Sequence, residues 1–526
     1  MKWLPCFLLS FCCFYSFAQP AIQWQKSFGG SGHEVAYSIQ QTPDSGYVVA
    51  GWSISNDGDV TGNHGDYDYW IVKLNGNGMI SWEKSFGGSG IDHAFAIQRT
   101  NNNGYIVAGS SNSNDSEVSG NHGSYDSWIV KLDSTGVIQW QKSLGGTGNE
   151  VAWSIQQTTD SGYIVAGGSN SNDGDITANH GGYDYWIVRL DSMGTVQWQK
   201  SLGGSADDIA YSIQQTNDGG YIVAGESYSN DGDVTGNHGV IDYWIVKLNS
   251  MGGIQWQKCL GGTSADFAYS IQQTSDSGYI IAGDSFSNDS DVTANHGGHD
   301  YWIVKLNNIG VIQWQKCLGG TGYYDAAFSI QQTTDGGSVV AGYSNSVDGD
   351  VTGNHGGNSD YWIVKQDSTG AVQWQKCLGG TSQDNAYSIR ETIDGGYIVA
   401  GGSSSNNGDI TAGRGGFDYW IVKLSPVVLG ATEINTSLSN PQIFPNPISN
   451  LTTISFSLLQ SEKISVNIYD ITGRLIKNLI IGNLNPGEHQ LKWNVADENK
   501  IDDGVYLLNI TGESFSQSCK LVVVKQ

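Results

Sequence analysis

The sequence has 526 residues, among them 72 Gly, 18 Trp and 26 Tyr, and its 51 acidic and 25 basic side chains give a net charge of −26. It is too aromatic for a disordered acidic tail and too rich in Gly for a helical bundle, so we expect an all-β protein. The negative charge argues against nucleic acid and anionic membranes as partners.

The N-terminal segment has the pattern of a secretory signal peptide. Lys2 is followed by an apolar run over residues 3–17, and small residues precede a cleavage point after Ala18. We therefore expect residues 1–18 to direct export. Nothing later in the chain has the length and apolarity of a transmembrane helix.

Residues 22–424 contain seven repeats. Two series of Trp recur every 58 residues, with one step of 60 in each series, beginning at Trp24 and at Trp70. Each unit holds four β-rich segments, such as residues 152–158, 163–168, 184–190 and 196–202, which are separated by Gly-containing turns. Four strands in a unit of this length are typical of one propeller blade, so the sequence predicts a seven-bladed β-propeller over residues 19–425.

The two ends of the repeat region support a closed ring. Residues 22–28 form a lone fourth strand, and the seventh unit stops after its third strand, residues 418–424. Pairing these segments completes the last blade and leaves no free edge. We also expect the small residues of each first strand, such as Ala36 and Ser38, to face the ring axis.

The repeat motif resembles known propeller repeats. Its successive parts are SIQQT, GYIVAG, NHG, DYWIVKL and IQWQK. This unit is similar to the β-propeller repeats of secreted bacterial proteins, and its last two strands are similar to quinoprotein blades. Residues 19–526 contain no vicinal Cys pair, so no organic cofactor is expected.

The loop after the second strand of each unit is acidic. Asp57, Asp59 and Asp68 occupy positions 1, 3 and 12 with Gly at position 6, the spacing of a single-loop calcium site. The next four units repeat these acids as Asp115, Glu117 and Asp126; Asp173, Asp175 and Asp184; Asp231, Asp233 and Asp242; and Asp289, Asp291 and Asp300. The loops are either calcium sites or turns in which the side chains satisfy the backbone.

The last two units depart from this pattern. An insertion moves Asp360 to position 13, and in the seventh unit Asn407 and Arg414 replace the first Asp and the His. Every loop except that of the seventh unit carries one His: His64, His122, His180, His238, His296 and His355. One His per blade cannot chelate a single transition metal, so we expect these side chains to form hydrogen bonds within their loops.

A second set of acids precedes the first strand of each unit. Its members are Glu34, Asp92, Glu150, Asp208, Asp266, Asp325 and Asp384. They could encircle the mouth of the central channel and attract a cation. Alternatively, each could bind backbone N–H groups where the strand begins.

Residues 426–440 are expected to form a linker, and residues 441–526 a small antiparallel β-sandwich. This last segment contains FPNP at 444–447, VNIYDITGRLIK at 466–477, GVYLLNI at 504–510 and a terminal KLVVVKQ. The motif order resembles the type A C-terminal sorting domain of proteins exported by the type IX secretion system of Bacteroidetes. The resemblance implies that residues 441–526 interact with the secretion machinery, and that the protein reaches the cell surface or the medium.

The repeats contain no nucleophile elbow, phosphate-binding loop or paired metal-binding His motif. A unique site would use the residues that break the symmetry, which are His33, Trp52, His93, Arg99, Trp153, His299, Tyr323, Tyr324, Arg390 and Glu391. The region from His33 to His93 is the best acid/base candidate among them. We expect a monomeric, non-catalytic binding or adhesion protein for a glycan or a protein. The alternatives are an extracellular polysaccharide lyase or hydrolase and a purely structural scaffold.

Overall fold

The computed structural model describes residues 19–411, 413–427, 441–458, 461–470, 474–497, 501–512 and 516–525. These residues belong to two compact units, one of residues 19–427 and one of the residues from 441 onward. The expected signal peptide and most of the expected linker lie outside the described residues. Within the described part of the chain, no helix is long and apolar enough to span a membrane.

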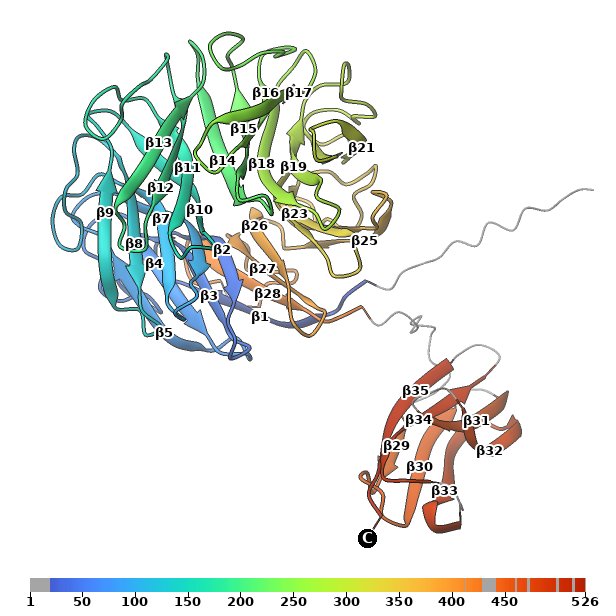
Figure 1. Cartoon of the computed structure of the whole chain (residues 1–526). Coiled ribbons are helices and arrows are strands. Elements are labelled where there is room, and N and C mark those ends of the chain that lie inside the picture. The colour runs from blue at the N-terminus through green and yellow to red at the C-terminus, as the bar shows by residue number, and fades with distance from the viewer. Residues whose placement is uncertain are drawn as a thin grey trace, which may run out of the picture. The chain divides into compact units, whose positions relative to one another are not determined.

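The first unit is a ring of seven four-stranded antiparallel sheets, which confirms the predicted propeller (Figure 1). Blades one to three contain β2 (Glu34–Gln41), β3 (Tyr47–Ser53), β4 (Asp68–Leu74) and β5 (Ile80–Phe86); β6 (Asp92–Arg99), β7 (Tyr105–Ser111), β8 (Asp126–Leu132) and β9 (Ile138–Leu144); and β10 (Glu150–Gln157), β11 (Tyr163–Ser169), β12 (Asp184–Leu190) and β13 (Val196–Leu202). Blades four to six contain β14 (Asp208–Gln215), β15 (Tyr221–Ser227), β16 (Asp242–Leu248) and β17 (Ile254–Leu260); β18 (Asp266–Gln273), β19 (Tyr279–Ser285), β20 (Asp300–Leu306) and β21 (Ile312–Leu318); and β22 (Asp325–Gln332), β23 (Ser338–Ser344), β24 (Asp360–Gln366) and β25 (Val372–Leu378).

Blade seven joins the two ends of the repeat region. It consists of β26 (Asp384–Glu391), β27 (Tyr397–Ser403), β28 (Asp418–Leu424) and β1 (Ile22–Phe28). β1 pairs antiparallel with β28, with Ser27 opposite Trp420. The predicted closure is therefore confirmed.

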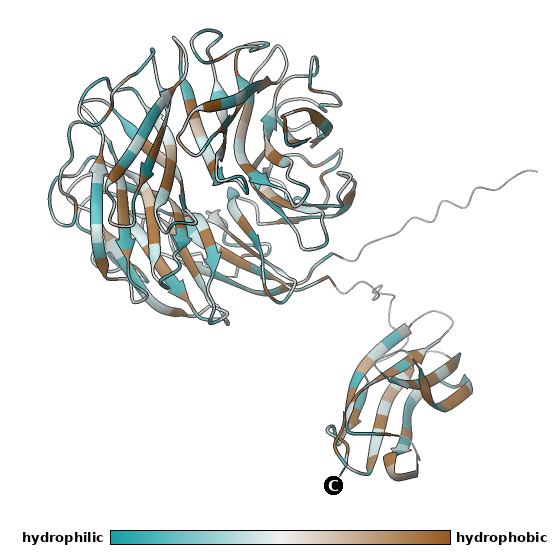
Figure 2. Cartoon of the chain, viewed as in Figure 1, coloured by the Kyte–Doolittle hydropathy of each residue, from teal (hydrophilic) through white to brown (hydrophobic). Residues whose placement is uncertain are grey.

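The blades pack through buried apolar side chains. Trp70 and the equivalent Trp of the other third strands are at most 3 % exposed. The Tyr beside this Trp reaches into the next blade, where the Tyr69 hydroxyl donates to the Trp128 carbonyl at 2.9 Å. Figure 2 shows the apolar bands along the strands and the hydrophilic loops between them. Cys259, Cys317 and Cys377 are buried free thiols at the Ser-sized position of the fourth strand.

A bulge in every first strand changes which side chains face the axis. In β2 the register shifts between Ala36 and Ser38, and the other six first strands shift at the same point. The extra residue, Tyr37 in blade one, projects into the channel. Ser38 lines the channel as expected, whereas Ala36 lies in the apolar core and Tyr37 enters the channel, because an extra strand residue breaks the normal alternation of faces.

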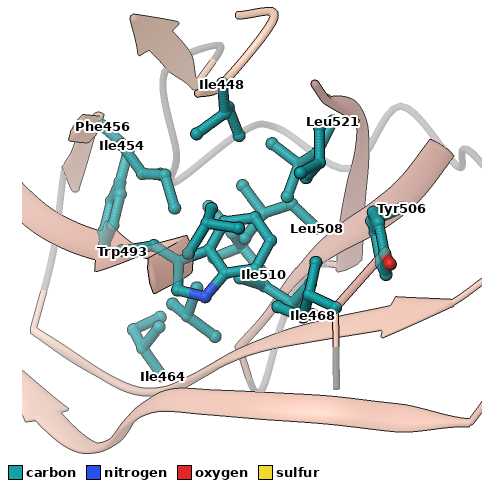
Figure 3. Packing of buried hydrophobic residues seen from close by; sticks show 14 of the residues in the cluster. Ile448, Ile454, Phe456, Ile464, Ile468, Trp493, Tyr506, Leu508, Ile510 and Leu521 are labelled. Carbon is teal, nitrogen blue, oxygen red and sulfur yellow. The ribbon is translucent and has the colours of Figure 1, made fainter. Parts of the chain in front are cut away.

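The second unit is a small β-sandwich. One sheet contains β29 (Gln442–Phe444), β30 (Leu451–Leu458) and β33 (Gly487–Asn494); the other contains β32 (Leu475–Leu484), β31 (Glu462–Asp470), β34 (Gly504–Thr511) and β35 (Ser516–Val523). A short 3-10 helix, η1 (Val495–Asp497), follows β33. Trp493 lies among Ile464, Ile468, Leu508 and Ile510 in the shared core (Figure 3).

Candidate functional site

The central channel holds a cavity of about 640 Å³. Its first layer is a closed circle of seven aromatic side chains, in which neighbouring ring centroids lie 4.1–5.5 Å apart: Tyr37, Phe95, Trp153, Tyr211, Tyr269, Phe328 and Tyr387. Beyond it lie a layer of six Ser and Ala96, and a layer of six Gln and Arg390. A cavity of this size can hold a small ligand.

The acids expected at the channel mouth lie elsewhere. Glu34 is completely buried and accepts hydrogen bonds from Gly30 N at 2.9 Å and Ser55 Oγ at 2.6 Å. The other six are equally buried and accept a backbone hydrogen bond from the preceding Gly-Gly pair at 2.8–3.0 Å: Asp92, Glu150, Asp208, Asp266, Asp325 and Asp384. None of the seven lines the cavity. The structure therefore places this ring at the strand entries and not at the channel mouth.

The acids of the predicted calcium loops bind backbone N–H groups of the connection that enters the blade and of their own loop. Asp57 Oδ1 accepts from Ser31 N at 2.7 Å, Asp59 Oδ2 accepts from Gly29 N at 3.3 Å, and Asp68 Oδ2 accepts from His64 N at 3.0 Å. The first contact is repeated by Asp115, Asp173, Asp231 and Asp289, the second by Asp175, Asp233 and Asp291, and the third by Asp126, Asp184, Asp242 and Asp300. These contacts attach each loop to the connection that enters its blade, as expected for a structural turn.

The loop His side chains contact an Asp of their own loop, and three of them also approach an acid of the next blade. In six blades the His Nδ1 lies 2.6–2.7 Å from Oδ2 of the last loop Asp, and the insertion before Asp360 preserves this contact. His64 Nε2 also lies 3.6 Å from Glu117 Oε2 of the next blade. In blade seven, Arg414 Nη1 takes this place and pairs with Asp59 Oδ2 of blade one at 2.6 Å. An ion pair with a permanently charged Arg thus connects blade seven to blade one.

Two buried carboxylates meet in the gap between adjacent blades. Asp68 Oδ1 and Asp92 Oδ2 each lie 2.6 Å from the position that a Cβ of Gly87 would occupy. Burial raises the pKa of Asp68 to about 6. In the part of the chain that the structure describes, no three His, Cys, Asp or Glu side chains are arranged to hold a metal ion. Calcium binding by these loops stays one of the two alternatives, beside the structural turn.

Calcium is tested by thermal unfolding of the full chain in EDTA and in millimolar calcium. Because protein groups already contact the loop acids, we expect the melting temperature to change by less than about 2 °C. A stable folded-state site would raise it well beyond that. A clear rise, with several ions bound per chain in a calorimetric titration, would instead assign the loops to calcium.

His33 and His93 have separate surroundings. His33 Nδ1 accepts from Phe417 N at 3.3 Å, where blade seven meets blade one. His93 packs against the rings of Trp52, Tyr67 and Phe95, at centroid distances of 5.0–6.0 Å. Burial lowers the pKa of His93 to about 4, so the ring is neutral at pH 7. The structure shows no contact that would join these two residues into one acid/base site.

A different set of symmetry-breaking residues does come together, at blades five and six. Phe286, His299, Tyr323 and Tyr324, here called the aromatic face, come from the loops at one end of the strands. His299 contacts the other three rings at centroid distances of 4.6–5.9 Å. Phe286 is 44 %, Tyr323 59 % and Tyr324 40 % exposed. Phe267 connects the aromatic face to the channel, because its ring centroid lies 6.1 Å from that of His299 and 6.3 Å from that of Tyr269 in the aromatic circle.

Buried acids lie beneath the aromatic face. His299 Nδ1 is 2.5 Å from Asp284 Oδ2, and both side chains are buried. Desolvation raises the pKa of Asp284 even though His299 contacts it. In blade four, burial raises the pKa of Glu226 to about 7, and the charge of Asp284 adds to this shift. The equivalent positions in other blades hold residues as different as Trp52, Ser110 and Gly168.

Sequence reasoning identified His299, Tyr323 and Tyr324 as exceptions to the repeat but did not join them. It missed Phe286 and Asp284, which are also exceptions at their repeat positions. Comparing the seven units column by column would have found both. The bulge that turns Tyr37 and its equivalents toward the channel has no comparable signal in the sequence.

Comparison with known proteins identifies the C-terminal unit. Residues 442–525 match the family described as the secretion system C-terminal sorting domain. No curated protein matches the chain. A tail of this kind indicates export to the cell surface or the extracellular space and interaction with the type IX secretion machinery.

Several solved structures resemble the chain weakly. PorZ, a surface component of the type IX secretion system of Porphyromonas gingivalis, has 13 % identity and a TM-score of 0.30 over 92 % of this chain, which spans 64 % of the PorZ chain. A PL25 ulvan lyase has 12 % identity and a TM-score of 0.45, with 77 % of this chain and 97 % of the lyase covered. A puromycin hydrolase has 10 % identity and a TM-score of 0.41, with 82 % and 59 % covered. The sheet topology and the family match together show that the chain is a seven-bladed β-propeller protein with a type IX secretion system C-terminal sorting domain.

Proposed function

We propose that this exported protein is a non-catalytic binding protein that holds a glycan on the aromatic face. The observation that supports this proposal is the gathering of exposed aromatic rings at positions where the repeat is broken. Exposed aromatic side chains that pack as a cluster mark interaction sites on soluble proteins. Their flat apolar surfaces suit the C–H faces of sugar rings, and the Tyr hydroxyls can bind the sugar hydroxyls.

Blade three does not offer the same surface. The positions of Phe286, His299 and Tyr324 are held in blade three by Asn170, Tyr183 and Asn149. One glycan site on a nearly symmetric ring therefore requires only a few substitutions in two blades.

An extracellular polysaccharide lyase or hydrolase is the second candidate. The observation that favours it is the pair of His299 and Asp284, because a buried carboxylate that orients an imidazole is a common arrangement for a general base. His299 is only 7 % exposed beneath its aromatic neighbours, so a reacting group would have limited access to it. We therefore place binding first.

Glycan binding is tested by probing an array of neutral and acidic oligosaccharides with the full chain. We expect the double substitution Tyr323→Ala and Tyr324→Ala to weaken binding at least tenfold, since both exposed rings are lost. The control is Met251→Ala, which alters a 72 % exposed side chain in the turn between β16 and β17.

The same samples separate binding from catalysis. Oligosaccharides that bind are incubated with the protein and examined for new chain ends. Cleavage that is lost in His299→Ala would establish the enzyme, whereas binding without cleavage supports the binding protein. Equal binding by the double variant and the parent would contradict the proposed site.

A further inference from the structure

The layer of Gln side chains in the channel has a fixed orientation. Oε1 of five of these residues accepts a backbone N–H of the next blade at 2.5–2.7 Å: Gln98, Gln156, Gln214, Gln272 and Gln331. An amide that accepts with its oxygen must turn its NH₂ group elsewhere. In the part of the chain that the structure describes, these five Nε2 atoms have no hydrogen-bond partner. Because the five residues line the cavity, the layer presents N–H donors to it.

Arg390 takes the place of Gln in blade seven. Its Nη1 donates to the Ile389 carbonyl at 2.7 Å and to Ser329 Oγ at 3.3 Å. Both acceptors are uncharged, and no ion pair of Arg390 occurs among the described residues. Desolvation lowers the pKa of the guanidinium, which is half-buried at the wall of the channel.

Six of the seven buried cations at one position of the third strands are paired with an acid, and the exception, Lys131, donates to the Leu132 carbonyl. Lys73 lies 2.9 Å from Asp44, and the same contact recurs at Arg189, Lys247, Lys305, Lys365 and Lys423, each with an Asp of the neighbouring turn. Glu391 is the acid nearest to Arg390 in the sequence, but its carboxylate binds Thr334 instead. The backbone N and Oγ of Thr334 donate to it at 2.8 and 2.9 Å. Arg390 is thus a half-buried charge in the channel wall, and no acid among the described residues pairs with it.

We propose that the Gln and Arg390 layer of the channel is a binding site for an oxyanion, either a free sulfate or phosphate or the acid group of a saccharide. A guanidinium presents several N–H donors in one plane and binds carboxylate and sulfate oxygens well. The glutamine NH₂ groups supply further donors around the axis. This site is separate from the aromatic face and does not depend on the proposed glycan binding.

The test measures heats of binding to the full chain for sodium sulfate, sodium phosphate and sodium glucuronate at constant ionic strength. We expect binding by at least one of these anions, and at least tenfold weaker binding in Arg390→Gln. The variant should fold, because Gln is the residue at this position in the other six blades. The melting temperature of Arg390→Gln without anions should stay close to that of the parent, because the charge that is removed is half-buried and pairs with no acid among the described residues.

Arg99→Gln is the matched control. Arg99 also replaces a Gln of the repeat, but it is the last residue of β6 and does not line the cavity. The Arg99→Gln variant should bind the anions as the parent does. Binding of the inorganic ions alone would identify the ligand as a free anion, and tighter binding of glucuronate would identify a saccharide acid. No heat with any of the three anions, or equal heats for the parent and Arg390→Gln, would overturn the proposal.

Discussion

Deletion of Ile22–Phe28 from the full chain is expected to lower the melting temperature of the propeller by about 10 °C or more, or to make the protein aggregate. The deletion removes β1, and the backbone N–H and C=O groups of β28 that pair with it lose their partners. It also removes Gln25, which accepts from the indole of Trp420 at 2.8 Å. An unpaired edge strand invites pairing with other chains. Thermal unfolding and size-exclusion chromatography measure both effects.

A circular permutation within the propeller is the control for this deletion. Residues 22–28 are moved to follow Leu424 through a copy of the turn at residues 191–195, which joins β12 to β13. Blade seven then has the same strand order as the other blades, and its four strands are restored. We expect the permuted protein to be monomeric and to melt near the parent. If the deletion variant is as stable as the parent, ring closure through β1 contributes little to stability.

The architecture could be predicted because the repeat supplies seven copies of the same information. The Trp series fixed the number of blades, and the unpaired segments at residues 22–28 and 418–424 fixed how the ring closes. Local patterns of this kind depend on strand alternation and turn chemistry, which are readable in a single sequence.

The site could be predicted only in part. Asp68 and Asp92 are 24 residues apart in sequence but meet across a blade gap, so loop spacing alone suggested an ion within one loop. The burial of Glu34 by Ser53 and Ser55 likewise depends on how two strands pair. His299, Tyr323 and Asp284 become one cluster only when adjacent blades are in place. Long-range packing, which the sequence pattern does not encode locally, decides these contacts.

Two adjacent glycines of β11 should respond very differently to Ala. A Cβ on Gly167 would lie 1.7 Å from the Val151 carbonyl oxygen, whereas the nearest atom to a Cβ on Gly168 is Tyr183 Cδ1 at 3.3 Å. The bulge between Ala152 and Ser154 holds the Val151 carbonyl against Gly167, and backbone on both sides prevents relaxation. We expect Gly167→Ala to reduce the free energy of unfolding by roughly 3 kcal/mol and the melting temperature by roughly 5–10 °C.

Gly168→Ala serves as the matched control, because it adds the same methyl group one residue away. The equivalent position accepts Trp52, Glu226 and Tyr343 in other blades, whereas the position of Gly167 is Gly in all seven. The melting temperature of Gly168→Ala should therefore stay within about 2 °C of the parent. Equal melting of the two variants would mean that the bulged strand can move away from the added methyl group. A large loss in Gly167→Ala alone would show that the bulge, which also turns the aromatic ring into the channel, is rigidly held.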